Sequence, residues 1–201
     1  MNQQPKPVAE ACERNKAPLL DVLRDVFSDR REVLEVGSGT GQHAVHFAAG
    51  LPHLVWHTCD LAMHHDGIRM WLDDAALPNT RGPYTLDLSQ GPWPLSTVDA
   101  VFSANVLHIV AWPLVERFFS GVGDVLAPGG VLAVYGPFNY NGAFTSESNG
   151  RFNDWLKARD PQSGIRDFEA IDALATRQGL TLQADVTMPA NNRMLWWRRA
   201  L

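Results

Sequence analysis

The chain of 201 residues predicts an α/β protein built on a doubly wound, seven-stranded, mostly parallel sheet with one antiparallel strand. Short β-branched runs alternate with longer amphipathic segments, which is the pattern of βαβ units and a parallel sheet. The last two runs are separated only by residues 188–192, and we expect this pair to add the antiparallel member. The length suits one domain with a full core, so residues 1–201 are expected to form a single domain.

The apolar periodicity gives the order of the elements. Strands are expected at residues 33–36, 54–58, 83–86, 98–103, 131–135, 180–186 and 193–199. Helices are expected at residues 18–28, 42–49, 63–77, 113–126 and 167–178, the first beginning at Pro18, because proline is tolerated at the first helical position. We expect residues 1–30 to form an N-terminal lid or helix and residues 31–201 the core, with the polar segment 136–150 inserted as a functional loop.

Composition and charge exclude several classes of protein. Lys and Arg number 17 against 22 Asp and Glu, a net charge of −5 without a basic block, which disfavours nucleic acid as a partner. No apolar run approaches the roughly 20 residues of a membrane helix, and the polar N-terminus lacks the apolar run of a signal peptide. Two cysteines are too few for a disulfide framework. We therefore expect a cytoplasmic protein without a membrane partner, and the oligomeric state stays open.

A glycine-rich turn follows the first expected strand, in the sequence EVGSGTGQH of residues 35–43. Glycines at such a turn let a ligand approach the N-terminus of the following helix closely. A nucleoside triphosphate site needs Lys and then Ser or Thr after the last glycine, whereas Gln and His stand there. A dinucleotide site needs the spacing G-x-G-x-x-G, and the third glycine comes one residue early. The turn therefore favours another ligand, and Glu35 provides an acidic group that suits a cationic one.

Carboxylates end the next two expected strands. Asp60 comes 21 residues after Gly39, close to the roughly 20 expected for a ribose-binding carboxylate. Asp87 follows the third strand and is succeeded by Leu88. The turn and the two carboxylates are in register on neighbouring strand ends, which makes the pattern far more specific than a lone glycine turn.

The G-x-G-x-G turn with Glu35, Asp60 and Asp87 resembles the cofactor site of class I S-adenosylmethionine-dependent methyltransferases. The resemblance implies a Rossmann-like class I methyltransferase fold, S-adenosylmethionine as cofactor and S-adenosylhomocysteine as product. It also implies that Glu35 faces the cationic methionine end, that Asp60 accepts both ribose hydroxyls and that Asp87 contacts the adenine amino group. The cofactor-binding residues that it implies are Glu35, Gly37, Ser38, Gly39, Gly41, Gln42, Asp60, Leu61, Asp87, Leu88 and Asn105.

From residue 14 onward the chain is similar to a narrower methyltransferase-like family of bacteria and animals, known as a domain of unknown function. The matching segments are residues 14–16 (RNK) with Pro18, 38–43 (SGTGQH), Asn105, 108–109 (HI) with Trp112, 135–138 (YGPF), 144–149 (FTSESN), 164–167 (GIRD) and 188–193 (MPANNR). Cys59 departs from the Ser expected in the family, although the neighbouring Asp60 is retained. This resemblance supplies no substrate.

Ligands of open α/β sheets lie beyond the carboxyl ends of the strands, so strand-end side chains are the catalytic candidates. His108 is the first choice for a general base, and a pocket-shaping histidine is an equally weighted alternative. Tyr135 is the second catalytic candidate. Arg14, Asn15 and Lys16 form either a cationic lid over a carboxylate or phosphate, or a solvated charged turn. The substrate-binding candidates are Arg14, Asn15, Lys16, Trp112, Glu147, Arg166, Asn191 and Asn192, and Trp93 with Trp112 could wall the pocket.

The favoured function is methyl transfer from S-adenosylmethionine to the oxygen, nitrogen or sulfur of a small-molecule acceptor. The acidic chain and residues 105–108 (NVLH), in place of the Asn-Pro-Pro-aromatic signature of nucleobase methylation, argue for a small substrate. One alternative is a catalytically silent cofactor-binding regulatory or scaffold protein. Another, a nicotinamide-dependent oxidoreductase, fails at the third glycine. No metal is expected, because no ligand set is complete, and we expect His43 near the carboxylate end of the cofactor.

Overall fold

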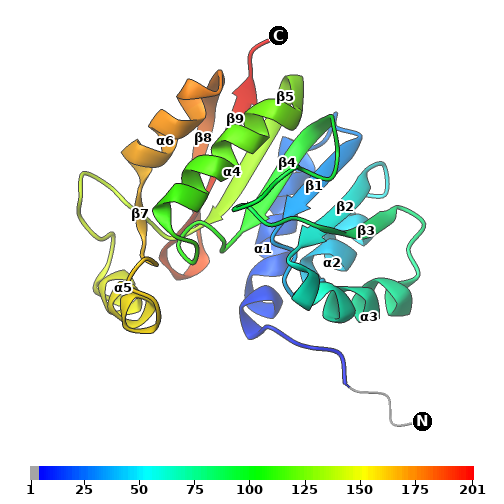
Figure 1. Cartoon of the computed structure of the whole chain (residues 1–201), viewed down its shortest axis with the longest axis horizontal. Helices are drawn as coiled ribbons and strands as arrows, with labels where there is room; N and C mark the ends of the chain where they lie inside the picture. The colour runs from blue at the N-terminus through cyan, green and yellow to red at the C-terminus, as the bar shows by residue number, and fades with distance from the viewer. Residues whose placement is uncertain (1–4) are drawn as a thin grey trace.

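The computed structural model describes residues 5–201, and Figure 1 shows a large twisted sheet with helices on both faces. The sheet has seven strands in the order β3-β2-β1-β4-β5-β9-β8. Their bounds are β1 (Glu32–Val36), β2 (Val55–Asp60), β3 (Thr80–Thr85), β4 (Val98–Ala104), β5 (Leu126–Gly136), β8 (Leu180–Met188) and β9 (Asn192–Arg199). The strands β1 to β5 run parallel, whereas β9 is antiparallel to both β5 and β8. The prediction of a mostly parallel, doubly wound sheet with one antiparallel strand is confirmed.

Six α-helices accompany the sheet in the described part of the chain: α1 (Glu10–Val26), α2 (Gln42–Gly50), α3 (His65–Ala75), α4 (Trp112–Val125), α5 (Glu147–Arg159) and α6 (Phe168–Arg177). The helices α4 and α6 cover the face toward the viewer in Figure 1, and α5 lies at the lower left. The short helix η1 (Ala62–His64) precedes α3, and the short helix η2 (Pro189–Asn191) joins β8 to β9. Among residues 5–201, no helix has both the length and the apolar character needed to cross a membrane.

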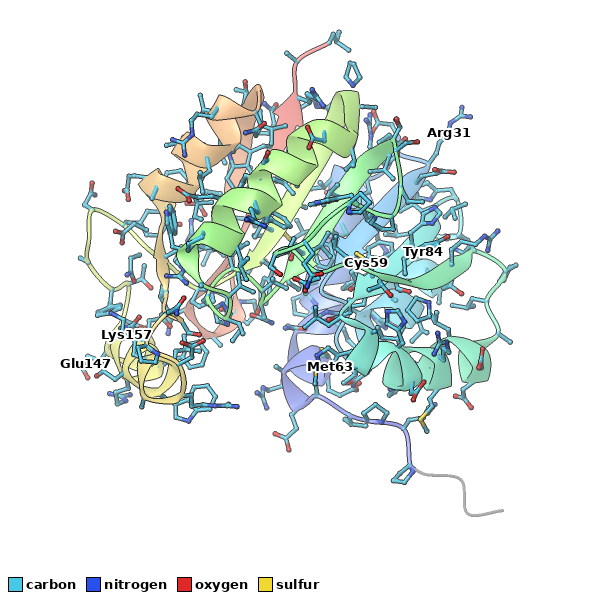
Figure 2. All side chains as sticks on the ribbon, viewed as in Figure 1. Arg31, Cys59, Met63, Tyr84, Glu147 and Lys157 are labelled. Carbon is cyan, nitrogen blue, oxygen red and sulfur yellow. The ribbon has the colours of Figure 1, made fainter. Side chains whose placement is uncertain are left out.

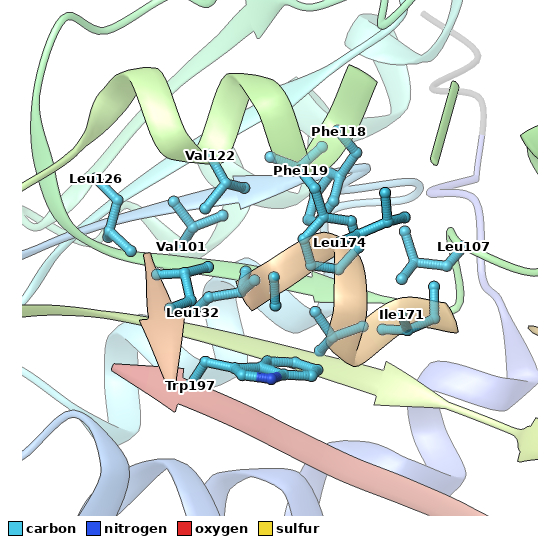
Figure 3. Close-up of a cluster of buried hydrophobic side chains, with 14 of the residues drawn as sticks. Val101, Leu107, Phe118, Phe119, Val122, Leu126, Leu132, Ile171, Leu174 and Trp197 are labelled. Atoms are coloured by element: carbon cyan, nitrogen blue, oxygen red, sulfur yellow. The ribbon is translucent and has the colours of Figure 1, made fainter. Parts of the chain in front are cut away.

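Two apolar cores lie on opposite faces of the sheet. Figure 3 shows the core under α4 and α6, where Phe119 meets the ring of Trp197 edge-on at 6.3 Å between centroids. The other core lies under α1 and α2, and Trp56 packs there between Phe47 and Phe102. Trp196 packs against this second core and Trp197 against the first, as strand alternation predicts. The two cores hold the sheet rigid and fix the positions of its strand ends.

The first helix begins earlier than expected. It starts at Glu10 and contains Pro18, so the prediction that it begins at Pro18 is wrong. Two acidic residues in its first turn form ion pairs with basic residues one turn later, Glu10 with Arg14 and Glu13 with Lys16, at 3.2 and 2.5 Å. Acidic residues at a helix N-terminus and such pairs stabilise the extra turns, although proline removes one hydrogen bond. Residues 1–4 of the expected lid lie outside the described residues.

Segment 136–150 is not the uniform loop that we expected. It contains β6 (Phe138–Asn139), which pairs with β7 (Arg166–Asp167), and it ends in the first turn of α5. Ser146 caps that helix, because its hydroxyl accepts a hydrogen bond from the backbone N–H of Asn149 at 3.1 Å. Strand β3 begins at Thr80 rather than at residue 83, because Thr80 pairs with Trp56 ahead of a register shift.

Candidate active site

A cavity of about 770 Å³ lies at the carboxyl ends of the parallel strands, the edge where the sequence places the ligand. Its walls come from residues 7–12, from the glycine turn with His43, and from residues that follow β2, β3 and β4. This volume falls within the range of about 300–1,000 Å³ typical of small-molecule sites. Asp60 and Asp87 are the two carboxylates in its lining, and no Lys or Arg belongs to that lining as far as the structure describes the chain.

The glycine turn takes backbone conformations that favour glycine. Gly37 and Gly39 have φ of +79° and +59°, and a Cβ at Gly37 would lie 2.4 Å from Cγ2 of Val106. A Cβ at Gly39 would meet no atom within 4 Å, so this residue offers bare backbone to the cavity that it lines. The N–H groups of Gly37 and Ser38 donate to the carbonyl of Cys59 at 3.0 and 3.1 Å, which fastens the turn to the end of β2.

Asp60 and Asp87 both line the cavity, where they were expected, with Leu61 and Leu88 beside them. The two oxygens of Asp60 accept hydrogen bonds from the backbone N–H groups of Gly39 and Leu61, both at 2.7 Å. Asp87 accepts from the N–H and hydroxyl of Ser89, and these hydrogen bonds hold the pKa of its carboxyl below the usual value. Both carboxylates are therefore oriented by backbone before any ligand enters.

Glu35 does not face the cavity, which differs from the expectation for this residue. Its carboxyl group is buried and accepts a hydrogen bond from Nε1 of Trp56 at 3.1 Å. Burial raises the pKa of Glu35 from 4.5 to about 7, although hydrogen bonds from Trp56 and Ser38 oppose the shift. The reason is that side chains alternate between the two faces of β1. Glu35 lies on the same face as Val33, which packs in the core under α2, and therefore does not point toward the cavity at the end of the strand.

Gln42 also lies outside the cavity lining and connects the N-terminal segment to the glycine turn. Its Oε1 accepts from the backbone N–H of Ala9 at 2.6 Å, and its Nε2 donates to Oε1 of Glu13 at 2.5 Å. The hydroxyl of Thr40 donates to the same Oε1 of Gln42 at 2.8 Å. This amide therefore holds the beginning of α1 against the turn, so that residues 7–12 can form one wall of the cavity.

A second polar cluster lies on the β5 side of the sheet. Nε2 of His43 is 2.6 Å from Oδ1 of Asn15, and the buried Tyr135 lies close to the amides of Asn15 and Asn192. Burial raises the pKa of Tyr135, while those two amides lower it. Of these four residues only His43 lines the cavity, so Tyr135 is not on its wall.

His108 was the expected base, but its side chain does not line the cavity either. The imidazole is buried against Phe152, and burial lowers its pKa from 6.5 to about 4, with a smaller contribution from the charge of Arg166. Arg166 itself donates to the carbonyls of Leu107 and Val110 at 3.0 and 2.5 Å. Arg166 therefore braces the segment after β4, of which Asn105 lines the cavity.

The other substrate-binding candidates lie away from the cavity lining. Nε1 of Trp112 donates to Glu116 at 3.1 Å, and Trp93 lines a separate cavity of about 460 Å³. Glu147 is exposed on α5, which Figure 2 shows well apart from Met63, a residue of the cavity wall. Neither tryptophan therefore forms part of the wall, contrary to the expectation.

The asparagine pair serves the turn between β8 and β9. Nδ2 of Asn191 donates to the hydroxyl of Ser148 at 3.1 Å, and Nδ2 of Asn192 donates to the carbonyl of Pro189 at 3.2 Å. Arg14 and Lys16 belong to α1 and pair with its own glutamates, so they form no cationic lid over the cavity. These ion pairs within a helix were not predicted, because the helix was expected to begin after Arg14 and Lys16.

Several residues of the cavity wall were not predicted from the sequence. Pro7, Ala9, Ala11 and Cys12 line the cavity only because α1 begins at Glu10. Val106, Ile109, Val110 and Leu114 form an apolar wall after β4, whose signal is the apolar run that follows Asn105. Within residues 5–201, no group of three or more His, Cys, Asp or Glu side chains lies close enough together to hold a metal ion.

The chain is similar to one protein family and to several solved structures. Residues 6–199 match the family model described as "Protein of unknown function (DUF938)". Among solved structures, an O-methyltransferase family protein from Burkholderia thailandensis is similar with a TM-score of 0.81 at 18% identity, over 95% of this chain and 58% of that one. The S-adenosylmethionine-dependent methyltransferase SibL gives a TM-score of 0.80 at 20% identity, over 95% and 56%.

Human N-acetylserotonin methyltransferase, solved in complex with SAM, is also similar, with a TM-score of 0.79 at 16% identity, over 96% of this chain and 53% of that one. The chain thus spans little more than half the length of each of these three proteins. At such identities the likeness shows a shared fold, the seven-stranded α/β fold of class I methyltransferases.

Proposed function

Because the chain belongs to the DUF938 family and has the class I methyltransferase fold, we propose that it transfers a methyl group from S-adenosylmethionine to a small-molecule acceptor. Solved proteins with this fold include S-adenosylmethionine-dependent methyltransferases, which supports the choice of cofactor. The acceptor atom is oxygen, nitrogen or sulfur. The acidic chain, and a cavity whose lining includes two carboxylates and, among the described residues, no Lys or Arg, favour a small acceptor over a nucleic acid.

One observation carries the proposal: the hydrogen bond of 2.7 Å between the Gly39 N–H and Asp60 at the cavity wall. It joins a bare glycine backbone to a carboxylate that keeps further lone pairs for ribose hydroxyls. Asp87 and Leu88 extend the same wall toward the position of an adenine ring. The space beside Gly39, which a Cβ would enter without contact, fits a ligand that approaches the backbone closely.

The cofactor would supply an activated methyl group on a sulfonium. The residues of this chain would bind and orient it, with Asp60 and Leu61 at the ribose and Asp87 with Leu88 at the adenine. Asn105 and the apolar wall of Val106, Ile109 and Val110 would exclude water from the reacting atoms. Holding two reactants in attack geometry in a dry site lowers the barrier, and a base that takes a proton is needed only where the acceptor atom carries one. His108 and Tyr135, which lie outside the cavity lining, would not contact the cofactor directly.

Calorimetry with S-adenosylhomocysteine tests the proposal. We expect binding by the wild type and its loss in Asp60→Ala. Asp66→Ala is a matched control, because Asp66 lies on α3 outside the cavity lining and forms an ion pair with Arg69. A wild type that binds neither S-adenosylmethionine nor S-adenosylhomocysteine would show the proposal to be wrong.

The alternative is a cofactor-binding regulatory protein without turnover. The observation in its favour is that His108 and Tyr135, the two expected catalytic side chains, lie outside the cavity lining. Incubation with a labelled methyl donor and a metabolite extract separates the two functions. Label transfer that is lost in Asp60→Ala supports catalysis, and binding without any transfer favours the regulatory protein.

A further inference from the structure

The segment that precedes α1 forms one side of the cavity. Residues 6–9, which we call the strap, have no regular secondary structure, and Figure 1 shows this segment running below α3. Pro7 and Ala9 of the strap line the cavity, and so does Gly67 of α3. A Cβ on Gly67 would lie 2.8 Å from Cγ of Pro7, so the proline ring packs directly on the helix. The strap therefore touches α3 at the cavity wall.

Trp71 and Asp74 of α3 hold the strap in this position. The indole N–H of Trp71 donates to the carbonyl of Pro7 at 2.8 Å, and the ammonium of Lys6 lies 4.2 Å from the centroid of the Trp71 ring. The same ammonium forms an ion pair with Asp74. We call these contacts of Trp71 and Asp74 the latch. Trp71 itself lies outside the cavity lining, so it can act on a ligand only through the strap.

The two ends of the strap are held differently. At Ala9 the backbone N–H donates to Oε1 of Gln42 at 2.6 Å, and the next residue already belongs to α1, which packs on the second core. The latch at the other end consists of side-chain contacts, and the ion pair within it is partly exposed, by 32% at Lys6 and 66% at Asp74. Single hydrogen bonds and exposed ion pairs contribute little net free energy. The strap can therefore detach from α3 and turn about Ala9 while α1 stays in place.

We propose that the latched strap closes the cofactor cavity, and that the cofactor enters and leaves only after the strap detaches from Trp71. The inference rests on the proposed function, which places the ribose at Asp60 and Leu61. The chain continues from there through Met63 of the same cavity wall into α3, to which the strap is attached. The strap thus lies on the side of the cavity that the ribose occupies, and Trp71 is a positioning residue.

A strap that controls entry has a different kinetic effect from a passive wall. A weaker latch opens the cavity more often both in the free protein and in the complex, so the association and dissociation rate constants rise by the same factor and Kd stays nearly unchanged. The loss of a direct contact with the ligand instead raises the dissociation rate constant alone and weakens binding. Removal of one hydrogen bond corresponds to about 2- to 10-fold in the opening equilibrium.

Surface plasmon resonance with the immobilised protein and S-adenosylhomocysteine measures both rate constants, and calorimetry measures Kd. Trp71→Phe keeps a ring beside Lys6 but removes the donor to Pro7, so we expect both rate constants to rise by about 2- to 10-fold with Kd nearly unchanged. Asp74→Asn weakens the ion pair and should raise both rate constants by a smaller factor. Trp155→Phe, at an exposed position on α5 outside the cavity lining, is the matched control and should change neither.

The outcomes separate the strap from the proposed function. A rise in the dissociation rate constant alone, with weaker binding, would overturn the inference, and so would unchanged rate constants in Asp74→Asn and Trp71→Phe. Asp74→Asn alters only an exposed side chain, so it tests the latch even if Trp71→Phe does not fold. In each of these cases the wild type still binds the ligand and the proposed function stands. A wild type that does not bind S-adenosylhomocysteine contradicts the proposed function and the inference with it.

Discussion

The buried carboxyl of Glu35 makes the stability of the ligand-free protein depend on pH. Burial raises the pKa of Glu35 from 4.5 to about 7, so the folded state favours the protonated form. The associated stability is fully present below pH 4.5 and is lost as the pH rises through about 7. At about 1.36 kcal/mol per pKa unit, the loss amounts to about 3 kcal/mol.

The substitution Glu35→Gln isolates this effect. Glutamine has nearly the same shape, stays neutral and still accepts the hydrogen bond from Trp56. Urea unfolding should therefore give nearly equal stabilities for the variant and the wild type at pH 4.5, and a variant more stable by about 3 kcal/mol at pH 8. The depressed pKa values of His43 and His108 act in both proteins and cancel in the difference.

Glu116→Gln is the matched control, because Glu116 also accepts from a tryptophan indole at 3.1 Å but is exposed. Its stability difference from the wild type should not change with pH. A Glu35→Gln difference that stays constant from pH 4.5 to pH 8, or that favours the wild type at pH 8, would refute the burial argument.

Three further results are expected. Gly37→Ala should lower the free energy of unfolding by about 1–3 kcal/mol or more, because its Cβ would lie 2.4 Å from Cγ2 of Val106. Gly39→Ala has open space around its Cβ but a φ of +59°, so it should lower the free energy of unfolding by about 1–2 kcal/mol. Urea unfolding measures both variants, and equal losses would contradict the packing argument. In the same assay, Arg166→Met should lower the free energy of unfolding by about 1.5–3 kcal/mol, because Arg166 donates to the carbonyls of Leu107 and Val110. Arg151→Met, at an exposed position on α5, should leave the free energy of unfolding nearly unchanged. Similar losses in the two variants would argue against the bracing role of Arg166. His108→Gln should leave the calorimetric affinity for S-adenosylhomocysteine unchanged, and a large loss would place His108 in direct contact with the ligand.

The sheet could be predicted from the sequence because its signals are local. Strands such as β4 and β5 contain short apolar runs, and the glycine turn, Asp60 and Asp87 sit at strand ends, which a parallel sheet brings to one edge. The structure accordingly brings these residues to one cavity. The antiparallel position of β9 followed from the short connection between the last two strands.

The rest of the site depends on contacts between distant segments. The start of α1 at Glu10 depends on Gln42, whose amide accepts from Ala9 and donates to Glu13 across more than 25 residues of sequence. The side on which Glu35 lies follows from alternation along β1, whereas the position of His108 outside the cavity lining depends on its packing against Phe152, which is far away in the sequence. His43 was placed near the ligand and does line the cavity, but its contact with Asn15 at 2.6 Å joins residues that are far apart in the sequence.

A crystal structure of the complex with S-adenosylhomocysteine tests the central claim most directly. The account predicts ribose oxygens within about 3.2 Å of the Asp60 carboxylate and the adenine beside Asp87 and Leu88. A ligand outside this cavity, or one whose ribose does not touch Asp60, would contradict the assignment of the cavity as the methyl-donor site.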